Sequence, residues 1–153
     1  MTINYGRVVL GGFVAGIVFD AYENVMNGML MRAQWSAIMT SLNLPQYSST
    51  DIILFNLVGL VTGFAAVWTY AAIRPRFGGG PRTALIAAAI TWLTAKAVVV
   101  SYPLISGIYP LQPMAIMLTA QVGEIALGTL AGAWFYREAE GSAVGAEMGA
   151  VRV

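Results

Sequence analysis

The chain has 153 residues, of which 58% are hydrophobic and 10% are charged, and its formal net charge is +1. Soluble domains carry about 25% charged residues, and a chain this small cannot bury so much apolar surface in a water-soluble core. Cysteine and histidine are both absent, which excludes disulfides and thiolate metal sites and removes the commonest metal and haem ligand. We therefore expect one compact integral membrane domain that holds no metal and no cofactor.

Four long apolar runs cover most of the chain, at residues 8–30, 52–73, 83–105 and 111–136. Each has about 20 residues or more, the length with which a helix crosses a bilayer core of roughly 30 Å. The first run is too long for a cleavable signal, and no typical cleavage site follows it. The sequence therefore predicts an all-α membrane protein, a four-helix transmembrane bundle of up-down topology. The bundle occupies residues 1–137, and a cytoplasmic tail follows at residues 138–153.

The connection after the first run, residues 32–51, carries two local signals. Asp51 indicates a helix start, capped by Ser49 or Thr50. The other signal predicts a short interfacial helix over residues 33–42, whose apolar side carries Trp35, Ile38, Met39 and Leu42.

Positive charge gathers at one end of the predicted bundle. Arg74, Arg76 and Arg82 crowd the short, glycine-rich connection between the second and third runs, whereas the connection between the third and fourth runs carries no charge. The positive-inside rule then places both termini in the cytoplasm. The three arginines also make a candidate site for an anionic lipid headgroup, although a positive-inside turn explains them more simply.

Charged residues lie inside three of the four runs at a common depth. Asp20, Lys96 and Glu124 are each 13 or 14 residues from an arginine at the cytoplasmic end, which is roughly 20 Å at about 1.5 Å per residue. Glu23 lies one turn further out. Because charges in hydrocarbon are costly, we expect these four residues to form a buried charged layer. Its supporting polar side chains are Asn24, Asn27, Asn56 and Gln121.

Three interpretations of this layer remain open. The favoured one is a structural lock, in which Lys96 pairs with Glu124 or Asp20 and the asparagines complete the hydrogen bonds. The second is a proton or cation site, with Glu23 or Glu124 as the titrating group. The third turns some of the polar groups outward to a partner protein.

Small residues recur at a spacing of four in three of the runs. A Gly-x-x-x-Gly spacing allows two membrane helices to approach closely. It therefore predicts helix-packing sites at three pairs: Gly12 and Gly16, Gly59 and Gly63, and Gly128 and Gly132.

Three segments resemble a group of small four-span bacterial membrane proteins to which no activity is assigned. They are residues 6–16 (GRVVLGGFVAG), 70–84 (YAAIRPRFGGGPRTA) and 132–136 (GAWFY). The resemblance implies a multi-pass protein of the bacterial inner membrane and implies no activity. A glutamate in the first of four short spans is also similar to the small multidrug-resistance transporters. The greater length, the buried Lys96 and the long first connection depart from that pattern, so their activity is not carried over.

No nucleophile and base stand at a recognisable spacing, and the parts outside the membrane are too small for an enzyme or receptor domain. We therefore expect a non-catalytic accessory or structural subunit of a larger membrane complex, such as a respiratory or photosynthetic assembly. Its expected partners are membrane lipids and other membrane-protein subunits, and not nucleic acid. The alternative is a small proton- or cation-coupled transporter or channel that acts as a homo-oligomer.

Overall fold

The computed structural model describes residues 3–136, so Arg137 and the predicted tail at residues 138–153 lie outside the described residues. This part of the chain is helical and contains no strand. Its elements are α1 (Tyr5–Val25), the π-helical segment η1 (Met26–Leu30), α2 (Arg32–Ser41), α3 (Ser49–Phe77), α4 (Pro81–Trp92), the π-helical segment η2 (Leu93–Ala97), α5 (Val98–Ile105) and α6 (Leu111–Phe135).

Four continuous helical stretches are long and apolar enough to cross a membrane. They are Tyr5–Leu30, Ser49–Phe77, Pro81–Ile105 and Leu111–Phe135. These stretches coincide closely with the four predicted runs, because both follow from the same apolar length. The prediction of an all-α bundle with four spans is therefore confirmed, and the chain has the architecture of a multi-pass membrane protein.

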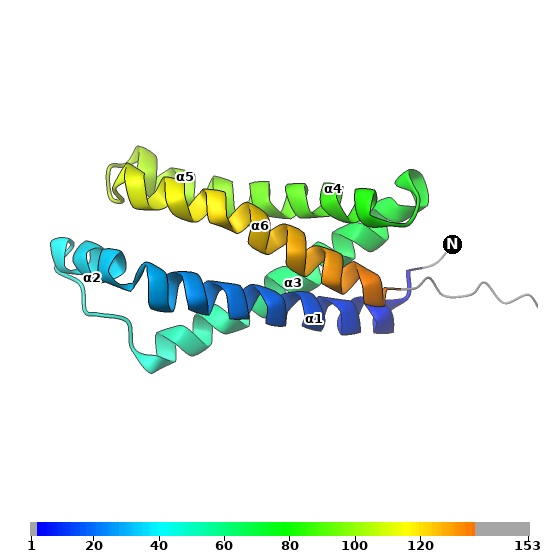
Figure 1. The fold of residues 1–153 in the computed structure, drawn as a ribbon, viewed down its shortest axis with the longest axis horizontal. Helices are drawn as coiled ribbons and strands as arrows, with labels where there is room; N and C mark the ends of the chain where they lie inside the picture. The colour runs from blue at the N-terminus through cyan, green and yellow to red at the C-terminus, as the bar shows by residue number, and fades with distance from the viewer. Residues whose placement is uncertain (1–2, 137–153) are drawn as a thin grey trace, which may run out of the picture.

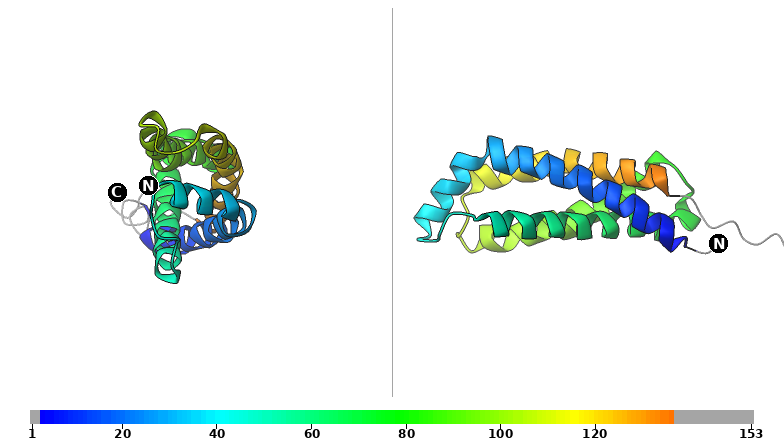
Figure 2. Two further views of the ribbon diagram at one scale, coloured as in Figure 1. Left: turned by 90° about the vertical axis from the view of Figure 1, so that its left-hand side faces the viewer. Right: turned by 90° about the horizontal axis from the view of Figure 1, so that it is seen from below.

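Helices α1 and α4 each pack against both α3 and α6 (Figures 1 and 2). We call the end that holds the start of α1, the α3–α4 turn and the end of α6 the inner end. The opposite end, with α2 and the α5–α6 connection, is the outer end (Figure 1). The backbone N–H of Asn4 donates to the hydroxyl of Tyr136 at 3.4 Å and ties the start of α1 to the end of α6.

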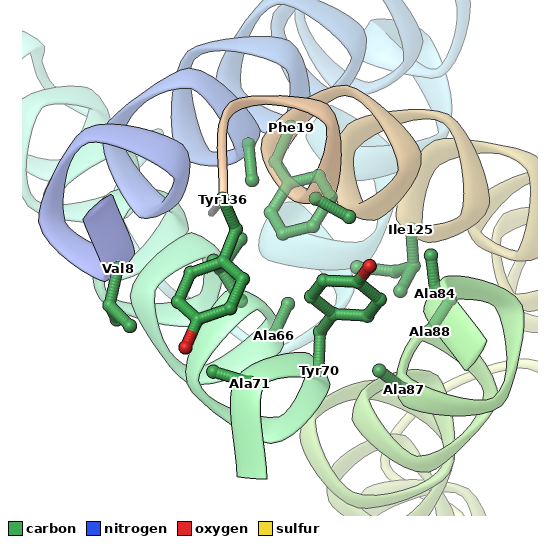
Figure 3. Packing of buried hydrophobic residues seen from close by; sticks show 13 residues of the cluster. Val8, Phe19, Ala66, Tyr70, Ala71, Ala84, Ala87, Ala88, Ile125 and Tyr136 are labelled. Atoms are coloured by element: carbon green, nitrogen blue, oxygen red, sulfur yellow. The ribbon is translucent and has the colours of Figure 1, made fainter. Parts of the chain in front are cut away.

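The core of the inner half is built from alanines around a few large side chains. The rings of Tyr70 and Tyr136 meet edge to face at 5.9 Å between centroids, and the guanidinium of Arg74 lies 5.6 Å from the Tyr136 ring centre. Phe19 of α1 packs against Gly128 of α6, and Ile125 of α6 lies beside Ala84 and Ala88 of α4 (Figure 3). Because alanine adds little bulk, the helices approach closely here and the few aromatic rings fill the remaining volume.

The predicted glycines stand where helix backbones meet. A Cβ atom built at Gly63 would lie 2.7 Å from the Cα of Gly16, and one at Gly132 would overlap the carbonyl oxygen of Gly11. Gly12 faces Phe64 of α3, and Gly128 faces Phe19 of α1. Two of the three predicted pairs thus join α1 to α3, and the third joins α1 to α6. Sequence reasoning missed Gly11, which lies outside the four-residue spacing.

Several helix ends differ from the predicted ones. Helix α1 begins before Arg7, at Tyr5, because the side chain of Asn4 caps it by accepting from the N–H of Arg7 at 3.2 Å. Helix α3 continues past Arg74 and through Pro75 to Phe77, since a proline in the last turn removes only one backbone bond. Gly78 follows as the capping residue, and its φ of 83° favours glycine.

The cap of α3 also differs from the predicted Ser49 or Thr50. Ser48 is the cap: its hydroxyl accepts from the N–H of Asp51, whose carboxylate accepts in turn from the N–H of Ser48 at 2.8 Å. We expect Ser48→Ala to cost about 1 kcal/mol of unfolding free energy because it removes this cap. Thr50→Ala is the matched control, because Thr50 is exposed and lies two residues after Ser48. This variant should leave the unfolding free energy nearly unchanged. Reversible unfolding in mixed detergent micelles measures both, and equal values for the two variants would contradict the cap.

The predicted short helix after the first run is confirmed as α2. It lies across the outer end, with Ile38 buried and Trp35, Met39 and Leu42 half-buried on its inward side. The Trp35 ring also contacts the rings of Tyr47 and Tyr109. Burial raises the pKa of the Tyr47 phenol, and the nearby Tyr109 and Asp51 raise it further. These rings pack together at the outer end of the bundle.

Candidate functional site

The carboxylate of Glu23 is the centre of the charged layer. It accepts hydrogen bonds from the ammonium of Lys96, from the amide of Asn27 and, at 3.0 Å, from the amide of Gln121. These donors come from η2, η1 and α6, so a single side chain of α1 connects three other parts of the bundle. The bonds satisfy Glu23 in the way that a buried charge requires.

Lys96 lies between two carboxylates. Its ammonium forms an ion pair with Glu23 and a second one, at 3.3 Å, with Glu124 of α6. Of the two predicted partners, Glu124 is therefore present and Asp20 is not. Residues three apart on a helix point in directions that differ by about 60°, and this offset aims Glu23 rather than Asp20 into the bundle.

Exposure falls steadily across this group of three charges. The side chains of Glu23 and Lys96 are 25% and 18% exposed, whereas that of Glu124 is 0% exposed. Gln121, one turn before Glu124 on α6, is 5% exposed. The layer is therefore closed at Glu124 and open at Glu23.

Helix α2 is joined to the layer through Trp35. Its indole N–H donates to the side-chain oxygen of Asn27 at 2.8 Å, and Asn27 donates in turn to Glu23. Sequence reasoning placed Trp35 on the inward side of a short helix but did not connect it with the charges. One signal could have found this link: the indole N–H of an inward-facing Trp35 needs a hydrogen-bond acceptor nearby.

Asp20, Asn24 and Asn56 form a second polar group, which we call the outer polar patch. The amide of Asn24 donates to the side-chain oxygen of Asn56 at 2.9 Å and to the backbone oxygen of Asp20 at 2.7 Å. Asp20 stands against Gly59 of α3, where a Cβ would overlap its carboxylate. Asn24 is exposed and the other two are partly exposed. Within residues 3–136 no hydrogen bond reaches the Asp20 carboxylate.

Both π-helical segments lie in this layer, since η1 contains Asn27 and η2 contains Lys96. A π-helical turn holds an additional residue, which rotates the side chains relative to a regular α-helix, and such turns are frequent at functional sites. Sequence reasoning missed both segments. Neither contains a proline, and the composition of MNGML and LTAKA shows no distinct signal.

The three arginines of the candidate headgroup site gather at the inner end. Arg76 and Arg82 are exposed, while Arg74 is partly buried against Tyr136. Residues 3–136 contain no group of three acidic side chains placed to hold a metal ion. The chemistry that the layer offers is therefore that of carboxyl, ammonium and amide groups.

In the described part of the chain, these features define a helical membrane bundle in which Lys96 lies between two acidic side chains. No family model, no curated protein and no solved structure matches the chain. Its function must accordingly be argued from the layer itself and from the faces of the bundle around it.

Proposed function

We propose that this protein is a non-catalytic accessory subunit of a larger complex in the bacterial inner membrane, with both termini in the cytoplasm. The observation that carries the proposal is the outer polar patch of Asp20, Asn24 and Asn56. It lies at the depth of the charged layer, where hydrocarbon would surround any bundle that stood alone. A polar surface in hydrocarbon needs a partner with which it can form hydrogen bonds.

The outer half of α3 supports the same proposal. Ile53, Phe55 and Val58 point in different directions around this helix, and all three are exposed. Figure 1 shows why: the start of α3 diverges from α4 and α5, so little of the described chain covers it. At the polar patch α1 and α3 are joined by the hydrogen bond from Asn24 to Asn56. We propose that a transmembrane helix of another subunit covers these exposed side chains.

Charge indicates the chemistry of that partner helix. Asp20 is acidic and Asn24 and Asn56 are amides, so the complementary surface carries a basic or amide side chain at the same depth. The positive charge of Arg74, Arg76 and Arg82 at the inner end supports the cytoplasmic assignment of both termini. The same arginines are suited to anionic lipid headgroups on that side of the membrane.

The test is extraction from native membranes in a mild detergent, followed by mass spectrometry of the proteins that co-purify at fixed stoichiometry. We expect partner subunits with the wild-type chain and their loss from the double variant Asp20→Ala, Asn56→Leu. Thr119→Val is the matched control. It also removes a polar group from an exposed helix face, and that hydroxyl bonds only within its own helix, to Ala115.

A wild-type chain that purifies alone or with copies of itself would contradict the accessory role. It would favour the second candidate, a small proton- or cation-coupled transporter acting as a homo-oligomer. One observation supports that candidate: polar side chains continue from exposed Asn24 through Glu23 and Lys96 to enclosed Glu124. Proton or cation flux into vesicles that contain the purified chain distinguishes the two functions.

A further inference from the structure

The closed end of the charged layer lacks hydrogen-bond donors. The side-chain oxygen of Gln121 and both carboxylate oxygens of Glu124 are buried, and within the described chain none of the three receives a hydrogen bond. Buried acceptors are almost always paired, so three together need an explanation. Nearby donors are already engaged. The Gln121 amide donates to Glu23, and Lys96 approaches Glu124 at 3.3 Å without completing a hydrogen bond.

One additional hydrogen atom, bound to the Glu124 carboxyl group, would supply most of the missing hydrogen-bond donors. A carboxyl group that holds a proton gains an O–H donor, which an ionised one lacks. Gln121 and Glu124 are three residues apart on α6 and therefore neighbours on its surface. An O–H on Glu124 could donate to the free oxygen of Gln121, which would pair both side chains at once.

The charges of the layer indicate the same proton. Glu23 and Lys96 form a hydrogen-bonded ion pair of zero net charge. An ionised Glu124 would add an uncompensated negative charge to a side chain that is 0% exposed, and such a charge is costly to bury. The other ionisable groups nearby both belong to α1: Asp20, which is also acidic, and Tyr22, whose hydroxyl donates to the backbone oxygen of Ala120 on α6 at 3.0 Å. Trp35 of α2 and Asn56 of α3 bring no charge to the layer.

We propose that Glu124 is a proton-binding site: its carboxyl holds a proton and donates it to the side-chain oxygen of Gln121. Lys96 and Glu23 then remain an ion pair beside it, and Glu23, which is 25% exposed, is the side on which the proton exchanges. The inference is independent of docking at the outer polar patch. It holds whether the chain is an accessory subunit or a transporter.

The orientation of the Gln121 amide gives the rival location. If the amide is turned over, its nitrogen faces Glu124 and its oxygen faces Glu23. The Gln121 oxygen then lacks a donor next to Glu23, and a proton held by Glu23 instead of Glu124 would supply one. The two arrangements differ in which glutamate carries the hydrogen, so an experiment that identifies that side chain separates them.

Infrared spectroscopy of the purified full-length chain in lipid identifies the proton directly. We expect a carbonyl band of a protonated carboxylic acid at neutral pH, with a shift in D₂O because the proton exchanges. Glu124→Gln should abolish this band, while Glu23→Gln and Asp20→Asn should retain it. Glutamine at 124 has the same shape and can donate to Gln121, so the variant should fold, which helical circular dichroism checks.

A second variant keeps the test independent of the folding of Glu124→Gln. Gln121→Met removes the acceptor, so the band should persist but move to higher wavenumber as the O–H loses its hydrogen bond. An unmoved band in Gln121→Met, a band that survives Glu124→Gln, or no band in the wild-type chain would each overturn the proposal. Loss of the band in Glu23→Gln would assign the proton to Glu23 and overturn it as well.

Discussion

Replacing Lys96 with methionine should destabilise the bundle by about 3–5 kcal/mol, the cost of breaking a buried ion pair by removing one partner. Methionine preserves the apolar length of the lysine, so the loss would report the missing charge rather than a cavity. Without the ammonium, the Glu23 carboxylate keeps only the amides of Asn27 and Gln121 as donors. Reversible unfolding in mixed detergent micelles measures the change against the wild-type chain.

Double variants then show which glutamate needs the lysine. If Glu124 holds a proton, the charge stranded by Lys96→Met is that of Glu23. The pair Lys96→Met, Glu23→Gln should therefore regain most of the lost stability, and Lys96→Met, Glu124→Gln should not. Recovery in the second pair alone would mean that Glu124 carries the charge. A Lys96→Met chain as stable as the wild type would mean that neither ion pair contributes to folding.

The depth of the charged layer could be predicted from the sequence, but its pairing could not. Depth follows from the rise of a helix, and counting from the arginines places Asp20, Lys96 and Glu124 at one level. Pairing depends on rotation about each helix axis. The π-helical turn around Lys96 changes that rotation, and the sequence LTAKA carries no signal that predicts a π-helical turn. For the same reason Asp20 and Glu23 could not be ranked as partners of Lys96.

The fold likewise has features that could be predicted from the sequence and features that could not. Four spans could be predicted because bilayer thickness sets their length, and the glycine spacing indicated where helices would touch. Two features of the structure have no such local cause: α3 diverges at its outer half, and α2 joins the layer through Trp35 and Asn27. Both depend on contacts between residues far apart in the chain. The exposed outer half of α3 is also one of the features that support the accessory role.

Gly63→Ala should cost about 1–3 kcal/mol, a loss that the usual preference of helices for alanine cannot offset fully. The new Cβ would lie 2.7 Å from the Cα of Gly16, which is backbone and cannot turn aside as a flexible side chain can. Helices α1 and α3 would have to separate. Unfolding in mixed micelles measures the loss, with Gly123→Ala as the matched control.

The Gly123→Ala control separates the effect of the α1–α3 contact on stability from the effect of alanine's higher helix propensity. A Cβ at Gly123 would meet only the hydroxyl of Tyr22, at 3.8 Å, so Gly123→Ala should leave stability unchanged or raise it. The separation forced at Gly63 would also stretch the 2.9 Å bond between Asn24 and Asn56, two turns further out along α3. Gly63→Ala should therefore release partner subunits as well as weaken the bundle. Equal stability of the two alanine variants would mean that α1 and α3 are not in backbone contact at Gly63.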